Sequence, residues 1–383
     1  MNSRERVLIT LNHREPDRVP FCLGGTVATM ISIRTYTGVR RLLGLPEKPV
    51  AVGDIIMQMA NLDDDVRDTL KVDTHEVGPR SSYVGSRVET LEMTGYRYFH
   101  DEWGIGWRMP LSEGFYYDMF DYPLRDITSP ADVAHYPWPD PVEPSRFVGL
   151  AEETKRVHDV EKRAVILGGL TAGILEMAAF MMGYDNFYSA LVLDPKTVTA
   201  IFDKVLELKL AYWEKALAEC GQYVDVVCEA DDLAGQNDLL ISPKTYRELI
   251  KPRHTTLFNF IKKQAPVKVW MHSCGAVRKI IPDFIESGVD ILNPVQVNAT
   301  GMDTLELKHE FGKDIVFWGG GVDTQFVLPN GTPKQVKDEV RRRLDDLMPG
   351  GGFVFGTVHN VQADVPPENF LAMWEALQEF GTY

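Results

Sequence analysis

The feature that most constrains the fold is a regular alternation of short apolar runs with helical patterns through the C-terminal half of the chain. The predicted strands are residues 224–230, 267–271, 290–294, 315–318 and 352–355. The predicted helices between and after them are residues 242–263, 276–287, 304–311, 332–347 and 366–380. Such alternation predicts an α/β fold in which helices cover a parallel sheet.

Two further apolar runs, at residues 164–167 and 19–23, bring the number of predicted strands close to eight. Because the strands are short and evenly spaced, a (β/α)8 barrel fits better than an open doubly wound sheet. No GxGxxG motif follows the first strand, so the fingerprint of a dinucleotide-binding fold is missing. Within the helical region 242–263, Ser242 is the expected N-cap, and Pro252 is expected to break or kink the helix.

Residues 70–145 interrupt this rhythm and are rich in Tyr, Trp, Pro and Asp. We expect a capping insertion of short antiparallel strands and loops over one end of the barrel, within a single domain that spans residues 1–383. Two interpretations of the insertion remain open. It is either a cap that only packs on the barrel or an aromatic wall of a substrate pocket.

Composition and charge exclude several classes of function. Lys and Arg number 40 against 55 Asp and Glu, giving a net charge of −15, which argues against binding to nucleic acid or to an anionic membrane surface. Four cysteines in 383 residues do not form a disulfide scaffold. No signal-peptide core and no apolar run long enough to span a membrane are visible, so the sequence predicts a cytoplasmic protein.

The sharpest chemical signal is a histidine and a cysteine, His272 and Cys274, directly after the predicted strand 267–271. Residues two apart on an extended backbone point to the same side, and active sites of barrels lie at the carboxyl ends of the strands. His359 follows the last strand and faces the same end. Imidazole and thiolate ligands suit zinc, and catalytic zinc commonly has three protein ligands. A metal-free structural role for the three residues is the alternative.

Polar residues follow the other predicted strands at the same end of the barrel. Glu229, Asp231 and Asp232 are candidate catalytic residues, which can orient a ligand or transfer a proton. Capping of the next turn and helix is the alternative role for these acids. The candidate substrate-pocket residues are Asn293, Gln296, Asp323 and Asn360.

These segments together resemble the uroporphyrinogen decarboxylase superfamily over nearly the whole chain. The resemblance lies in the segments SRERVLITLNHREPDRVPF, DDLAGQNDLLISPKTYRELIKP, HSCG, DILNPVQ, WGGGVDTQ and HNVQADVPPENFLAMWEAL. It implies a distorted (β/α)8 barrel, in agreement with the strand count.

The resemblance divides between two branches of that superfamily. True decarboxylases carry an arginine-rich segment after the first strand, which binds a polycarboxylate tetrapyrrole. Here residues 22–30 read CLGGTVATM and contain no arginine, and the decarboxylases lack the His-x-Cys pair. The other branch, the corrinoid-dependent methyltransferases, has His-x-Cys and a third zinc ligand before a P-x-E-N helix start. His359 precedes Pro367-Glu368-Asn369 in that way.

The resemblance to this second branch implies zinc held by His272, Cys274 and His359, a small methyl donor, and a corrinoid carried by a partner protein. It also allows a homodimer. Coenzyme-M methyltransferases place a cysteine where His359 stands, so this site carries one thiolate fewer and is a stronger Lewis acid. Such a site suits an ether oxygen, and the aromatic insertion suits a methoxylated aromatic donor. A decarboxylase acting on a smaller carboxylic acid is the alternative function.

Overall fold

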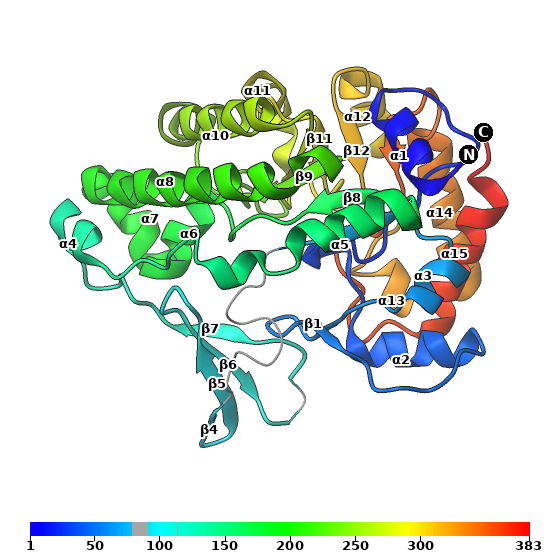
Figure 1. Cartoon of the computed structure of the whole chain (residues 1–383), viewed down its shortest axis with the longest axis horizontal. Helices are drawn as coiled ribbons and strands as arrows, with labels where there is room; N and C mark the ends of the chain where they lie inside the picture. The colour runs from blue at the N-terminus through cyan, green and yellow to red at the C-terminus, as the bar shows by residue number, and fades with distance from the viewer. Residues whose placement is uncertain (79–90, 113) are drawn as a thin grey trace.

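The computed structural model describes residues 1–78, 91–112 and 114–383, and its main feature is one curved parallel sheet surrounded by helices (Figure 1). Seven strands form this sheet in the order β13-β12-β11-β10-β9-β8-β3. Their bounds are β3 Thr74–Val77, β8 Ala164–Leu167, β9 Val226–Ala230, β10 Lys268–His272, β11 Ile291–Asn293, β12 Val316–Trp318 and β13 Phe353–Val354. All six pairings between neighbours are parallel, so their carboxyl ends share one edge.

The segment over residues 19–23 closes this sheet into a ring. The Cys22 N–H donates to the Phe355 carbonyl and the Phe355 N–H donates to the Pro20 carbonyl, both at 2.8 Å. On its other side, the Asp73 N–H donates to the Phe21 carbonyl, also at 2.8 Å. The segment thereby lies between β13 and β3 as an eighth strand position. The predicted distorted (β/α)8 barrel is confirmed.

The Asp73 side chain fastens this closure. It is fully buried, and its two oxygens lie 2.7 Å from Arg6 Nη1 and 2.7 Å from Arg18 Nη1. It also accepts the Phe21 N–H at 2.8 Å. Two cations and a backbone donor therefore balance one buried carboxylate, as a charge in a protein interior requires.

Helices cover the outside of the ring, and local sequence signals set their ends. Ser242 caps its helix by accepting the Thr245 N–H at 3.0 Å, and Gly288 ends α11 with a φ of 100°, which favours glycine. The longer helices are α1 Ser3–Leu11, α2 Ile33–Leu42, α6 Ile174–Met182, α7 Tyr184–Leu193, α8 Pro195–Cys220, α10 Lys251–Gln264, α12 Thr304–Phe311, α14 Pro333–Leu347 and α15 Pro367–Phe380. The shorter ones are α3 Asp64–Thr69, α4 Pro130–His135, α5 Leu150–Arg156, α9 Pro243–Thr245, α11 Ile281–Ser287 and α13 Val327–Asn330.

The expected interruption at Pro252 takes the form of a π-helical turn. This turn covers Tyr246–Ile250 and joins α9 to α10, in whose first turn Pro252 lies. A proline lacks the N–H that would continue the α-helical ladder, and the wider turn accommodates that loss without breaking the helical path.

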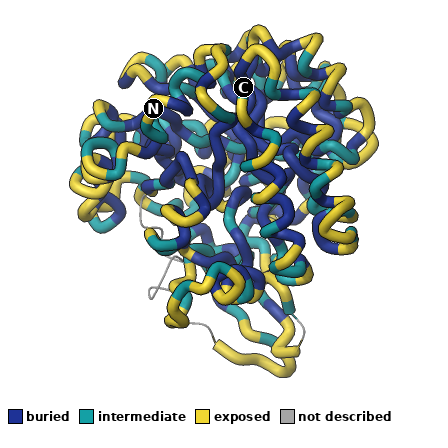
Figure 2. Tube along the Cα trace, turned by 90° about the vertical axis from the view of Figure 1, so that its right-hand side faces the viewer, coloured by how far each residue is buried: buried dark blue, intermediate teal, exposed yellow. Residues whose placement is uncertain are grey.

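Part of the predicted insertion 70–145 forms a four-stranded antiparallel sheet that projects from the barrel, with its outer hairpin exposed (Figure 2). Its strands are β4 Leu91–Met93, β5 Tyr96–His100, β6 Gly106–Pro110 and β7 Asp118–Asp121, and a separate short hairpin joins β1 Val52–Asp54 to β2 Met59–Ala60. Residues 79–90 and 113 of the predicted insertion lie outside the described residues. Its first part differs from the expectation, because Thr74–Val77 is barrel strand β3. This strand was not predicted because its sequence, THEV, contains polar side chains and so lacks a continuous apolar run.

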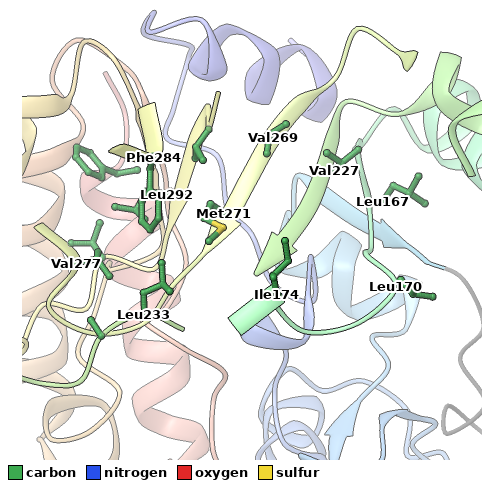
Figure 3. Packing of buried hydrophobic residues seen from close by; sticks show 14 of the residues in the cluster. Leu167, Leu170, Ile174, Val227, Leu233, Val269, Met271, Val277, Phe284 and Leu292 are labelled. Atoms are coloured by element: carbon green, nitrogen blue, oxygen red, sulfur yellow. The ribbon is translucent and has the colours of Figure 1, made fainter. Parts of the chain in front are cut away.

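Alternate residues of the barrel strands pack on opposite sides of the sheet. One set, which includes Leu167, Val227, Val269, Met271 and Leu292, packs beneath the helices (Figure 3). The intervening residues fill the barrel interior, where the rings of Trp270 and Trp318 lie 4.6 Å apart between centroids. This period of two is the geometry of a buried β-strand. No helix in the described ranges has the length and apolarity that a membrane crossing requires.

Removing the Asp73 carboxylate should destabilise the closed ring. We expect Asp73→Ala to lower the free energy of unfolding by about 3–5 kcal/mol, because Arg6 and Arg18 lose their shared buried partner. Glu47→Gln is the control, since the Glu47 side chain is 82% exposed and pairs with Arg41, which is itself 70% exposed. It should cost less than about 1 kcal/mol. Urea denaturation measures both, and equal small effects would contradict the role assigned to Asp73.

Candidate metal centre and cavity

The carboxyl ends of β10 and β13 bring together the three predicted metal ligands. His272 is the last residue of β10, Cys274 follows two residues later, and His359 lies in the segment after β13. One nitrogen from each histidine and the Cys274 Sγ all lie within 4.8 Å of one another. The Cys274 Sγ is 3.5 Å from His272 Nε2, and the two imidazole rings are 5.4 Å apart between centroids. Two imidazoles and a thiol at this spacing match the donor chemistry of zinc.

Asn293 sets the orientation of the His272 ring. The Asn293 amide donates from Nδ2 to the Trp318 carbonyl at 2.8 Å, so its Oδ1 faces His272 as an acceptor. His272 Nδ1 lies 2.6 Å from that oxygen and therefore carries the proton. This leaves Nε2 with a free lone pair on the side of Cys274. Hydrogen bonds of this kind are the usual support of histidine ligands.

The turn that carries Cys274 is held by side-chain acceptors from the segments that follow the two neighbouring strands, β9 and β11. The Cys274 N–H donates to Asp232 Oδ1 and the Gly275 N–H donates to Gln296 Oε1, both at 2.7 Å. Gly275 has a φ of 90°, and a Cβ at this position would lie 2.5 Å from the Ala234 carbonyl oxygen. Glycine is therefore required here for both the conformation and the close backbone approach.

The three predicted catalytic acids lie in different surroundings. Asp231 is fully buried and accepts the N–H groups of Leu175 and Glu176, so it caps α6 from outside that helix. Glu229 accepts from Lys209 Nζ at 2.7 Å and from Trp213 Nε1 at 2.6 Å. Asp232 lies 3.9 Å from His272 Nε2 and borders the cavity described below. Only Asp232 of the three directly adjoins the metal-ligand group.

The four predicted substrate-pocket residues do not border the cavity, and two of them hold the segment that carries His272 and Cys274. Asn293 and Gln296 hold His272 and the turn after Cys274. Asp323 accepts the Gln325 N–H at 2.7 Å, which shapes its own loop. Asn360 contacts Met57 Sδ at 3.0 Å and also accepts from Gln362. None of these four is among the described residues that border the cavity.

A cavity of about 570 Å³ opens beside His272 and His359. One wall comes from the insertion and contains Trp103, Trp107, Tyr116 and Tyr117. Phe180 of α6 and Tyr184 of α7 continue this aromatic surface. Of the two interpretations of the insertion, its placement favours the one in which it supplies a pocket wall.

Carboxyl groups that sequence reasoning missed also border this cavity. Its acidic residues are Asp54, Glu76, Asp101, Asp118, Glu176, Glu229 and Asp232, and no Lys or Arg is present among its described lining residues. Glu176 is the third residue of α6 and accepts the Gly173 N–H. This is a capping-box pattern, so the sequence indicates a helix cap at Glu176 and not a cavity residue. Glu76 lies in β3, the strand that the sequence did not predict. No periodic signal could have identified either residue.

Burial in this acidic surrounding shifts the titration of several groups. Burial raises the pKa of Glu76 to about 8, with Asp54 adding to the effect. Burial also raises the pKa of Glu176, and Asp232 and Asp231 contribute in the same direction. Burial lowers the pKa of His359 to about 4, and His272 adds to that shift. His359 is therefore neutral at physiological pH, the form in which histidine binds a metal.

The Cys274 thiol is held in its protonated form by its surroundings. Burial raises the pKa of Cys274, and Asp232 and Glu176 raise it further. A metal ligand must be the thiolate, so a bound cation would have to displace this proton. Positive charge at the site would lower the cost of ionising Cys274.

Comparisons with known proteins place this geometry among enzymes. The family model for uroporphyrinogen decarboxylase (URO-D) matches residues 120–380. The chain is 28% identical to a methylated-thiol–coenzyme M methyltransferase of Methanosarcina mazei, over 66% of this chain but only 63% of that relative. It is 26% identical to a uroporphyrinogen decarboxylase of Alkalilimnicola ehrlichii, over 73% of each chain. The structure of a methyltransferase from Methanosarcina mazei, 18% identical, matches with a TM-score of 0.62 over 99% of both chains, which shows a shared fold.

Loss of the Asn293 side chain should loosen the metal-ligand group. We expect Asn293→Ala to weaken zinc binding by about 10- to 100-fold, because His272 loses the acceptor that fixes its ring. Asn298→Ala is the matched control, since Asn298 is hydrogen bonded to Gln325 instead. Competition with a chromophoric chelator measures both affinities, and unchanged binding in Asn293→Ala would refute the role assigned to this residue.

Replacing Glu76 should stabilise the protein in a pH-dependent way. The folded state binds the Glu76 proton with a pKa of about 8, whereas the ordinary pKa of a glutamate side chain is 4.5. Wild-type stability from this group is therefore present at low pH and is lost as the pH rises from about 5 to about 8. Glu76→Gln removes that loss, so its advantage over wild type should grow with pH. Urea denaturation at about pH 5 and at about pH 8 measures the difference in stability between variant and wild type. Glu379→Gln, at an exposed position, is the control, and its difference from the wild type should not change with pH.

Proposed function

Because the chain belongs to the uroporphyrinogen decarboxylase family, we propose that it is a zinc-dependent methyltransferase of that family. It would move a methyl group between a small methyl donor and the cobalt of a corrinoid protein. The observation that carries the proposal is the convergence of His272, Cys274 and His359 within 4.8 Å beside a cavity. The similarity to a methyltransferase of Methanosarcina mazei supports the same reaction class.

The residues present fit a zinc ion. His272 presents Nε2, because Asn293 accepts from Nδ1, and His359 is neutral. Cys274 supplies a sulfur ligand from a turn held by Asp232 and Gln296. When bound, zinc would supply Lewis acidity toward the oxygen of a methyl donor, as a site with three protein ligands and an open position does.

The chain itself would bind and orient the donor. The wall of Trp103, Trp107 and Phe180 provides flat apolar surface, which suits a methoxylated aromatic ring. In such a donor the bond between the methyl carbon and oxygen breaks, and the methyl passes to reduced cobalt on the partner. The oxygen keeps the electron pair and takes up a proton. Glu176, whose raised pKa keeps it protonated, lies at the cavity wall as a proton source.

The alternative, decarboxylation of a smaller acid, finds less support in the cavity. A substrate carboxylate buried there would need counter-charges. The described lining residues include seven acidic side chains and no Lys or Arg. A further carboxylate in this surrounding would meet repulsion rather than a partner.

Metal content tests the proposal directly. We expect about one zinc per chain in the wild type and a large loss in Cys274→Ser and His359→Ala, since each removes one of three ligands. Cys228→Ser is the matched control, because Cys228 also borders the cavity but lies outside the ligand group. Elemental analysis of tag-free protein, followed by methyl transfer from methoxylated aromatics to cob(I)alamin, measures the effect. Full zinc content and activity in Cys274→Ser would overturn the proposal.

A further inference from the structure

The carboxyl groups on the cavity wall outnumber the cationic groups that the described chain places beside them. Two of its seven acidic residues are satisfied internally. Glu229 is paired with the buried Lys209, and Asp101 accepts from Trp107 Nε1 and from two backbone N–H groups. The remaining five have no ion-pair partner in the described chain other than the contact of Asp232 with His272. A ligand that enters this cavity therefore meets an excess of carboxyl groups.

Glu76 is the clearest member of this set. It projects from β3 at the cavity wall, and no hydrogen bond or ion pair joins it to any other described residue. Gly168, at the end of β8, leaves room in front of it, since a Cβ there would lie 3.1 Å from Glu76 Oε1. Asp54 also borders the cavity, and among the described residues it accepts only from backbone N–H groups, including that of Met57 at 2.6 Å. Both carboxyl groups are thus left with acceptor capacity that faces the ligand space.

Aromatic rings enclose the same space. The rings of Trp107 and Phe180 meet edge to face at 6.4 Å between centroids, and Phe180 meets Tyr184 at 6.2 Å. Trp103 and Tyr117 extend this wall. The faces of aromatic rings attract cations, and a tryptophan face does so most strongly. Aromatic faces together with unpaired carboxyl groups form the surrounding that proteins use for alkylated ammonium ions.

We infer that this cavity binds an organic ammonium ion, in contact with Glu76 and the aromatic wall formed by Trp107, Phe180 and Tyr184. Binding of the cation follows from the cavity alone. That the cation is carried by the methyl donor rests on the proposed methyltransferase function. Among methyl donors, the cavity would then select those that bear a positively charged nitrogen over neutral molecules of the same shape.

A pair of probes with the same shape tests the inference. Choline carries a trimethylammonium group, and 3,3-dimethylbutan-1-ol carries carbon in place of that nitrogen. Calorimetric titration of the wild type in a buffer of low ionic strength at about pH 9, above the Glu76 pKa of about 8, should give at least about tenfold tighter binding of choline than of the alcohol. Equal affinity for the two probes, or no binding of choline in the millimolar range, would overturn the inference.

Variants assign the selectivity to Glu76. Glu76→Gln keeps the size of the side chain, and we expect it to weaken choline binding by about three- to tenfold while leaving the alcohol unaffected. Asp54→Asn is a second variant with an expected effect in the same direction, and Glu379→Gln is the exposed control that should change neither affinity. Equal loss of both probes in Glu76→Gln, or loss of neither, would contradict the contact with Glu76.

Zinc content measured on the same samples separates this inference from the proposed function. Zinc-containing protein that does not prefer choline would refute the cation site and leave the methyltransferase proposal standing. Protein that lacks zinc but prefers choline would refute the proposal and establish the cation site by itself.

Discussion

Closure of the parallel sheet into a ring is the constraint on which the rest of the molecule depends. Asp73 secures it, because one buried carboxylate binds Arg6, Arg18 and the Phe21 N–H at the junction of the chain's first strand segment with β3. Only in a closed ring do the ends of all strands surround one opening. The segment after β13 then faces β10, which places His359 beside His272. The cavity and the ligand group are consequences of that closure.

Two kinds of group beside the cavity, a carboxyl group and a thiol, are held in their protonated form. Burial raises the pKa of Glu176, and the neighbouring Asp232 raises it further. Burial, together with Asp232 and Glu176, also holds the Cys274 thiol in its protonated form. Positive charge relieves both effects. A metal ion at the ligand group and an ammonium ion at Glu76 would act on the same surplus of carboxyl groups. The stability lost to this surplus is a cost that binding can recover, which is a common property of functional sites.

Much of the barrel could be predicted because its signals are local. The run AVIL at Ala164–Leu167 and the helix Thr304–Phe311 match their predicted bounds, since apolar periodicity and caps determine them. The proximity of His272, Cys274 and His359 could be predicted because each lies at or shortly after the carboxyl end of a strand, and these ends meet in a parallel barrel. Strand β3 was missed because Thr74, His75 and Glu76 are polar residues, although Thr74 and His75 are buried. The buried His75 side chain has a polar partner in Glu161, which is 86 residues away in the chain.

The sequence by itself determined the fold class and the order of the barrel strands from β9 onward, and it predicted the group of His272, Cys274 and His359, because these follow from periodicity and residue type within short segments. Only the tertiary structure decided what each acid does. Asp231 caps α6, Glu229 is paired with Lys209, and Glu76 borders the cavity with no hydrogen-bond or ion-pair partner among the described residues. Their role depends on which distant cation or backbone donor lies within about 3 Å of each carboxylate. That proximity arises from closure of the ring and packing of the insertion, which no local pattern encodes.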